Sequence, residues 1–268
     1  MSDVKPEDRI LNVIPSKEVE NDWGYTAAVG SAILEVPPKI PPSVDLREAW
    51  WDIGDQKDTG SCVGWASVDA ILRWHMVKAK KLEDKEKLSV RFQWMAAKEM
   101  DEWTTPSTCL ESQGTSLKAA LDVARNYGSV PDVEVPFEPE KLSHKSPNEF
   151  YAIASKYKII NYFNLRKPGL DWNKVKDRWK EWLAATGPIL TRLDVDSNWM
   201  NAEKTKGKLD KYSPETASGG HAVAIVGYTE DRFIIRNSWG TTWGDKGFAY
   251  ASMDYANAAL TEAYGVTV

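Results

Sequence analysis

The sequence predicts an α+β fold of two lobes with a cleft between them. Up to about residue 150, apolar residues recur every three or four positions, as in helices that bury one face. From about residue 151 onward, short runs of β-branched and aromatic residues alternate with turn residues, which is typical of strands. A helical lobe and a strand-rich lobe bury their apolar faces against each other, and ligand clefts commonly form where two such units meet.

Length, charge and hydropathy limit what the protein can be. The 268 residues suffice for one large domain or two modest lobes. The net charge of −5, with both signs mixed along the chain, disfavours nucleic acid as a partner, because nucleic acid is bound by basic patches. No run of about 18 apolar residues occurs, so we expect no association with a membrane.

The N-terminus and the cysteines together indicate the cellular compartment in which the protein works. The first residues lack the apolar run of a secretory signal. A chain without such a signal works in a reducing compartment, where thiols stay free. We therefore expect a cytoplasmic protein in which the two cysteines, Cys62 and Cys109, are not joined in a disulfide.

Residues 1–43 form a leader that is distinct from the body at 44–268. Prolines between residues 34 and 44 keep the end of the leader extended. Apolar side chains at 10–15 and 23–25 allow the leader to dock on the body. Two interpretations remain open at this point. The leader is either an arm packed on the body or an inhibitory segment that covers the cleft and is later cleaved.

The first lobe is expected to contain three main helices. The first begins at Cys62, because apolar residues recur at helical spacing from Trp65 onward. The second covers residues 89–100. The third follows Thr115 or Ser116, since either hydroxyl can cap the first turn.

The second lobe is expected to combine one long helix with several strands. Asp171 can cap the helix, and Gly187 and Pro188 end it. A strand then covers residues 189–193. Two further strands, at 221–228 and 232–236, are separated by a short polar turn and should pair as a hairpin.

Cys62 stands where the sequence places the start of a helix. A thiol is a strong nucleophile only as thiolate, and the dipole and free N–H groups of a helix start lower the thiol pKa. A neighbouring imidazolium would lower the pKa further. The alternative is that Cys62 is a small buried apolar residue. Cys109 lies in an irregular stretch and has no obvious partner.

The chain offers three histidines as a base for Cys62. His75 follows it on the same helix at a distance of roughly 20 Å, which is too far. His144 lies in a polar connector. His221 opens a strand after Gly219 and Gly220, whose missing side chains leave room for a substrate backbone. The alternative is that His221 has only a structural role, with the hydrogen bonds of its ring satisfied within the strand.

Asn237 and Gln56 can complete a site around these two residues. The hairpin of the second lobe would bring Asn237 beside His221, and an amide oxygen can accept the imidazole N–H. Trp239 can then shield that hydrogen bond from water. The side chain of Gln56 and the backbone N–H of Cys62 can donate to a developing oxyanion. Together these groups fill every role in amide hydrolysis.

The segments at 56–62, 220–223 and 236–244 resemble those of the papain-like cysteine peptidases. The resemblance runs from about residue 44 to about residue 251. It includes the interval of six residues from Gln56 to Cys62 and of sixteen from His221 to Asn237. These motifs are specific, because four residue types recur at matching intervals.

The resemblance implies a papain-like fold and a thiol protease with a catalytic triad. The left lobe, at about 44–150, would be helical, and the right lobe, at about 151–268, would be an antiparallel, barrel-like β structure. Peptide bonds would be hydrolysed by Cys62, His221 and Asn237, with Gln56 as oxyanion donor and without a cofactor or metal. It also places substrate-binding residues in and beside the cleft: Gly114, Thr115, Leu117, Gly219, Gly220, Ala222 and Trp239.

Specificity and partners follow from the same resemblance. Leu117, Gly219 and Ala222 would line the main specificity pocket, so we expect an apolar preference one residue removed from the scissile bond on the acyl side. Partners would be a peptide or protein substrate and the chain's own leader in the cleft, which makes the protein a possible zymogen. We expect a monomer that binds neither nucleic acid nor membrane.

The sequence departs from the family at three places. Thr59 replaces a cysteine that usually forms a disulfide, Val63 replaces an aromatic residue, and Gly114-Thr115 replaces a glycine pair. The short leader is similar to those of microbial members. Two alternative functions remain open. One is an amidase or transpeptidase with the same acyl-enzyme chemistry, and the other is a non-catalytic binding protein that keeps the fold.

Overall fold

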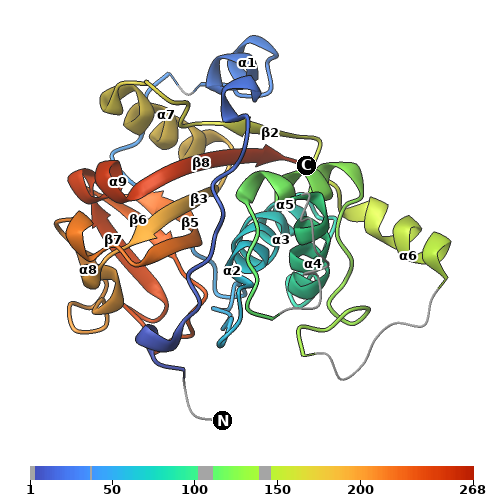
Figure 1. Ribbon diagram of the computed structural model, residues 1–268. Helices are drawn as coiled ribbons and strands as arrows, with labels where there is room; N and C mark the ends of the chain where they lie inside the picture. Colours follow the sequence, from blue (N-terminus) through green and yellow to red (C-terminus); the bar gives the residue numbers. More distant parts are fainter. Residues whose placement is uncertain (1–3, 37, 102–110, 139–145) are drawn as a thin grey trace.

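The computed structural model describes residues 4–36, 38–101, 111–138 and 146–268. Helices pack against both faces of a mixed sheet of eight strands, and the two-lobe α+β layout is confirmed (Figure 1). Cys109 and His144 lie outside the described residues. No helix in the described ranges is both long and apolar enough to cross a bilayer.

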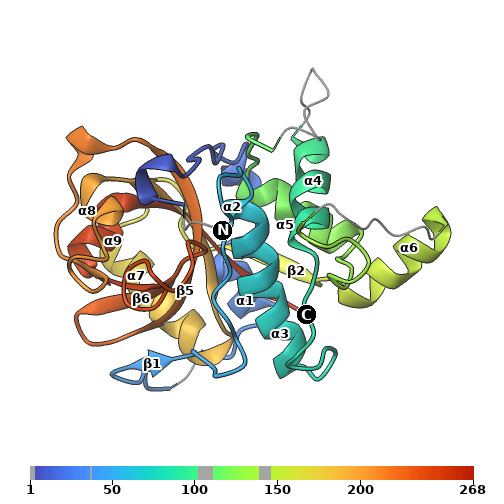
Figure 2. The same cartoon turned by 90° about the horizontal axis from the view of Figure 1, so that it is seen from below.

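The helical lobe is organised around one long helix that starts at Cys62 and whose middle turns are wound more widely than an α-helix. Figure 2 shows this helix in the middle of the molecule, with the sheet on one side and α4 and α5 on the other. Ser89 and Ser116 cap α4 and α5 by accepting hydrogen bonds from backbone N–H groups of the first turn. The helices are α2 (Cys62–Gly64), η3 (Trp65–Leu72), α3 (Arg73–Lys78), α4 (Val90–Met100), α5 (Leu117–Asn126), α6 (Pro147–Ala154) and η4 (Ser155–Tyr157).

The strands form one sheet in the order β2-β8-β3-β5-β6-β7-β4, and β1 pairs with the end of β5. The expected hairpin is β5 with β6. Two features differ from the antiparallel, barrel-like lobe that the resemblance implies. The two-residue strand β4 runs parallel to β7, and β2 and β4 lie at opposite ends of the order, so the sheet of the described residues is not closed. The strands are β1 (Val44–Asp45), β2 (Asn161–Asn164), β3 (Ile189–Val195), β4 (Lys208–Leu209), β5 (Gly219–Tyr228), β6 (Arg232–Arg236), β7 (Phe248–Ser252) and β8 (Leu260–Thr267).

Both faces of β5 are buried, which is why its residues are apolar at consecutive positions. Ala222 and Ala224 belong to the core shared with the helical lobe, whereas Val223 and Ile225 belong to a second core. The second core is covered by α7, whose tryptophans Trp179 and Trp182 are fully buried. The remaining helices of this lobe are α7 (Trp172–Ala185), α8 (Ser197–Met200), η5 (Pro214–Thr216) and α9 (Met253–Ala259).

The leader crosses the molecule between the two lobes before it reaches α1, which lies beside β2 and α7 (Figure 1). Its backbone forms an isolated bridge with β5, at Asn12 and Gly220. Ala28 and Leu34 are buried in the core of the sheet lobe. The leader therefore has its own anchor beyond the cleft. Its helices are η1 (Pro6–Asp8), η2 (Val19–Asn21) and α1 (Tyr25–Gly30).

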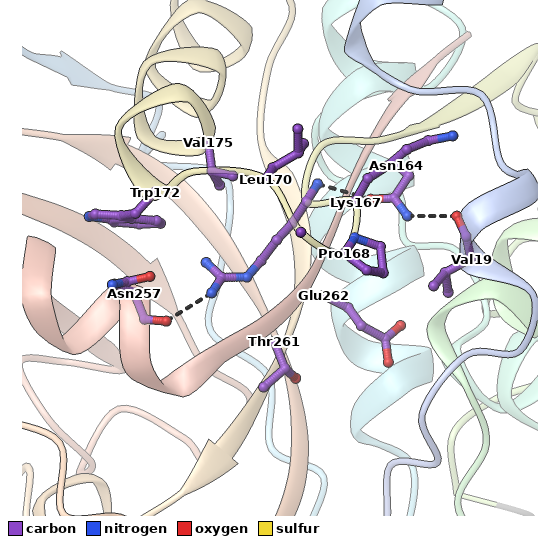
Figure 3. A pocket seen from close by; sticks show the side chains of 12 residues that line it. Val19, Asn164, Lys167, Pro168, Leu170, Trp172, Val175, Asn257, Thr261 and Glu262 are labelled. Carbon is purple, nitrogen blue, oxygen red and sulfur yellow. Dashed lines mark hydrogen bonds between the residues drawn. The ribbon is translucent and has the colours of Figure 1, made fainter.

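A pocket of about 310 Å³ adjoins this anchor, between the loop that precedes α7 and the junction of α9 with β8 (Figure 3). Val19 of the leader lines it, and the side-chain nitrogen of Asn164 donates to the Val19 carbonyl oxygen at 3.2 Å. Lys167 donates to the carbonyl oxygen of Glu20 at 3.0 Å. These polar contacts hold the leader on the sheet lobe after it leaves the cleft.

Candidate active site

Cys62 is the first residue of α2, as the sequence predicts, and it is fully buried. Burial raises the pKa of the thiol to about 11, although the backbone N–H groups of Ala222 and Val63 act to lower it. The contact with Ala222 places the sulfur beside β5, one residue from His221. Val13 of the leader belongs to the same apolar cluster as Cys62. The thiol is therefore covered and protonated while the leader is in place.

His221 and Asn237 lie together at the adjoining ends of β5 and β6. The imidazole Nε2 and the amide Oδ1 are 2.7 Å apart. The same oxygen accepts the backbone N–H of Ser238 at 2.8 Å, which identifies it as the oxygen of the amide. Nε2 must then carry the proton, which leaves Nδ1 as the basic nitrogen of the neutral ring.

The imidazole is fully buried, and its Nδ1 has no hydrogen-bond partner among the residues that the structure describes. Burial lowers the pKa of His221 to about 4, while the hydrogen bond to Asn237 acts in the opposite direction. The ring is therefore neutral at pH 7. A neutral imidazole with a free lone pair can accept a proton from a nearby acid.

Three buried tryptophans surround this pair. The ring centroids of Trp239 and Trp199 lie 5.0 and 5.9 Å from that of His221, and Trp243 packs on Trp199 at 4.5 Å. Such packing keeps water from the hydrogen bond between His221 and Asn237. Trp239 is thus buried against the imidazole. Trp199 is not among the residues that the sequence singles out, because its segment is polar.

Gln56 is fully buried beside Trp239. Its Oε1 accepts hydrogen bonds from Trp239 Nε1 at 3.2 Å and from the Ser238 hydroxyl at 3.1 Å. Its Nε2 donates to the carbonyl oxygen of Thr59 at 3.0 Å. An amide nitrogen has two hydrogens, so a second one is available for an oxyanion. The orientation of the side chain is fixed by contacts that the sequence did not reveal.

The predicted substrate-binding residues contact the leader. The N–H groups of Val13 and Ile14 donate to the carbonyl oxygens of Gly220 and Thr115, both at 3.2 Å. A side chain at Gly114 would lie 2.2 Å from the Asn12 carbonyl oxygen, so the glycine is required for the leader to approach this closely. The leader thus forms backbone hydrogen bonds with both walls of the cleft.

The apolar pocket residues meet a leader side chain. Leu117 and Ala222 are buried in the same cluster as Val13, and Val13 is 4% exposed. A side chain at Gly219 would collide with the carbonyl oxygen of Leu11. His75 lies far along the long helix, where burial lowers its pKa to about 4, and so takes no part in this cluster. Among the described side chains, no three acidic, histidine or cysteine residues form a group that could hold a metal ion.

The fold is a two-lobe α+β fold, with a buried cysteine at the start of the long helix and a histidine–asparagine pair at the ends of β5 and β6. The model of the papain family of cysteine proteases matches residues 40–267. The chain therefore belongs to this family and is a cysteine endopeptidase by family.

Individual relatives are distant. An uncharacterized peptidase C1-like protein from Acanthamoeba polyphaga mimivirus is 26% identical over 95% of this chain and 80% of its own length. Peptidase 1 from Euroglyphus maynei and human cathepsin O are each 27% identical over 85% of this chain. The chain spans 66% of the length of each of these two proteins.

Solved structures share the fold. Xylellain, a cysteine protease from Xylella fastidiosa, has a TM-score of 0.77 at 23% identity and covers 100% of this chain and 98% of its own. Procathepsin L2 from the larval midgut of Tenebrio molitor has a TM-score of 0.70 at 22% identity, over 98% of this chain and 80% of its own.

Proposed function

We propose that the chain is a latent cysteine endopeptidase in which Cys62, His221 and Asn237 act as the triad and the leader blocks the cleft. The hydrogen bond of 2.7 Å between His221 and Asn237 carries the proposal, because it leaves Nδ1 as the basic nitrogen of a residue whose chain neighbour, Ala222, contacts the Cys62 thiol. The buried, hydrogen-bonded Gln56 supports it as the oxyanion donor.

The reaction uses these groups in two halves. Nδ1 of His221 takes the proton of Cys62, and the thiolate attacks the peptide carbonyl carbon. The oxyanion accepts hydrogen bonds from Gln56 Nε2 and the Cys62 backbone N–H. The imidazolium then protonates the leaving amine, which departs and leaves a thioester. Water, deprotonated by the same nitrogen, hydrolyses the thioester and restores the thiol.

Val13 of the leader supports an apolar substrate preference. It packs with Leu117 and Ala222, which are the residues proposed to line the pocket for the side chain one removed from the scissile bond on the acyl side. Its backbone N–H donates to the carbonyl oxygen of Gly220 at 3.2 Å. The leader therefore occupies the space that a substrate requires, and substrate can enter only when the leader leaves.

Loosening the leader tests this function. The test uses full-length chains in a Cys109→Ser background and peptides with an apolar residue one removed from the scissile bond on the acyl side. The Arg9→Ala/Val13→Gly chain should hydrolyse these peptides at least about tenfold faster than the chain with the unaltered leader. The reason is that the two contacts contribute more than the roughly 1.4 kcal/mol that a tenfold change requires. Iodoacetamide should label Cys62 faster in the same variant.

Val36→Gly is the matched control, since Val36 is a leader residue of which 39% is exposed. It should leave hydrolysis and labelling at the level of the unaltered leader. Cys62→Ala in the loosened chain should abolish hydrolysis. Equal activity of the loosened and unaltered chains would refute the blocking role of the leader. Activity that survives Cys62→Ala would refute the proposed mechanism.

A further inference from the structure

The side chain of Arg9 is buried against the body at the start of the cleft. Only 2% of this side chain is exposed. Its Nη1 donates to the carboxylate of Asp55 and to the carbonyl oxygen of Lys57, the latter at 2.9 Å. Its Nη2 donates to the carbonyl oxygen of Trp239 at 3.4 Å, and the guanidinium carbon lies 5.9 Å from the Trp239 ring centroid. The guanidinium of Arg9 therefore donates to one charged and two neutral hydrogen-bond acceptors.

These acceptors belong to the body and are held there without the leader. Asp55 forms an isolated bridge with Trp239, and on either side of it the N–H groups of Gln56 and Gly240 donate to Ser238 and Gly54. The carboxylate of Asp55 also accepts the backbone N–H of Lys57 at 2.9 Å and lies 3.0 Å from its Nζ. Burial acts to raise the pKa of Asp55, but the hydrogen bonds from Arg9 and Lys57 outweigh it and hold that pKa below its usual value.

The position of this cluster relates it to the substrate. Asp55 precedes Gln56, the proposed oxyanion donor, and Trp239 packs on the imidazole of His221. Val13, four residues after Arg9, packs in the proposed acyl-side pocket. The cluster around Asp55 therefore lies on the leaving-group side of the scissile bond, close to the reacting atoms.

We propose that Asp55, the carbonyl oxygens of Lys57 and Trp239, and the Trp239 ring form a subsite for an arginine side chain of the substrate. The arginine is one of the first two residues on the leaving-group side, and Arg9 occupies the subsite in the latent chain. This inference rests on the proposed function. A planar guanidinium suits it better than an ammonium group, because the fork reaches separate acceptors while its face lies over an aromatic ring.

Internally quenched peptides test the subsite in the full-length Arg9→Ala/Val13→Gly chain, where it is empty. The peptides are identical except for arginine, citrulline, lysine or alanine at the first or second residue of the leaving group. Citrulline keeps the shape of arginine without its charge. We expect kcat/KM for the best arginine peptide to exceed that for its citrulline counterpart on the order of tenfold, with lysine in between, as one partly buried charge pair allows.

Two substitutions in that chain provide the control. Asp55→Asn should bring the ratio of kcat/KM for the arginine peptide to that for the citrulline peptide close to one. Asp55→Glu keeps the charge and should retain a preference for arginine. A substrate whose leaving group is a dye without a side chain should be cleaved equally by all three chains, which shows that each variant is folded.

The outcomes distinguish a failure of the subsite proposal from a failure of the proposed function. Cleavage without a preference for arginine, or a preference that Asp55→Asn leaves unchanged, overturns the subsite alone. If no peptide and no dye substrate is cleaved, the proposed function falls and the subsite falls with it.

Discussion

Replacing Asp69 by asparagine should destabilise the folded chain more than the same replacement of an aspartate at the surface. Asp69 lies two turns after Cys62 on the long helix, and its carboxylate contacts Arg236 at 2.8 Å and Arg73 at 3.4 Å. The three side chains are between 1 and 6% exposed. Arg236 ends β6 and immediately precedes Asn237, so this ion pair connects the helix of Cys62 to the strand that leads into the partner of His221.

The expected loss follows from this burial. Removing one partner of a buried ion pair leaves an uncompensated charge and costs about 3 kcal/mol or more. The Asp69→Asn substitution would leave two buried guanidinium groups without their carboxylate. For a chain of this size, a loss of about 3 kcal/mol corresponds to a decrease in Tm of roughly 5 to 6 °C.

Thermal unfolding followed by tryptophan fluorescence measures this change. Asp210→Asn is the matched control, because Asp210 forms an ion pair of 2.6 Å with Arg232 but 70% of its side chain is exposed. That substitution should cost less than about 1 kcal/mol. If the two variants unfolded within about 2 °C of each other, the buried pair would not stabilise the contact between the lobes, and the reasoning would be wrong.

Three further predictions concern the site. Asn237→Ala in the loosened chain should lower kcat/KM at least about tenfold, because the imidazole loses the partner that sets its tautomer; an unchanged value would contradict this role. Trp199→Ala should destabilise the chain by about 3 to 5 kcal/mol in urea unfolding, since it opens a cavity beside His221; a loss below about 1 kcal/mol would contradict it. Both His75 and His221 are buried with pKa values of about 4, below the 6.5 of an exposed histidine. The unfolded chain therefore binds more protons between these values, so stability should fall as pH decreases from about 6.5 to about 4, and His75→Phe should weaken that dependence.

Much of the local structure could be read from the residues. Helical spacing after Cys62 located the long helix, and Ser89, Ser116 and Asp171 cap helices where their hydroxyl or carboxylate groups can accept N–H groups. The hairpin that joins His221 to Asn237 followed from two apolar runs and a short turn. These features depend on neighbours in the chain, so a single sequence contains the information.

Segments whose structure depends on distant partners could not be read in the same way. The stretch after Asn198 is polar and shows no apolar periodicity, yet Trp199 is buried because Trp239 and Trp243 enclose it. The strand β4 pairs with β7 and forms one end of the open sheet, but its two residues are too few to form a recognisable strand pattern.

The sequence by itself determined the residues of the candidate site, the main helices of the first lobe and the hairpin of the second, because residue types and intervals are properties of the chain. Only the tertiary structure decided the state of that site. The lowered pKa expected of a helix-start cysteine is reversed here, since burial beside Val13 outweighs the helix and leaves Cys62 as a thiol. Likewise, Arg9 reads as one charge in a polar segment, and its role appears only where folding brings it to Asp55, 46 residues away.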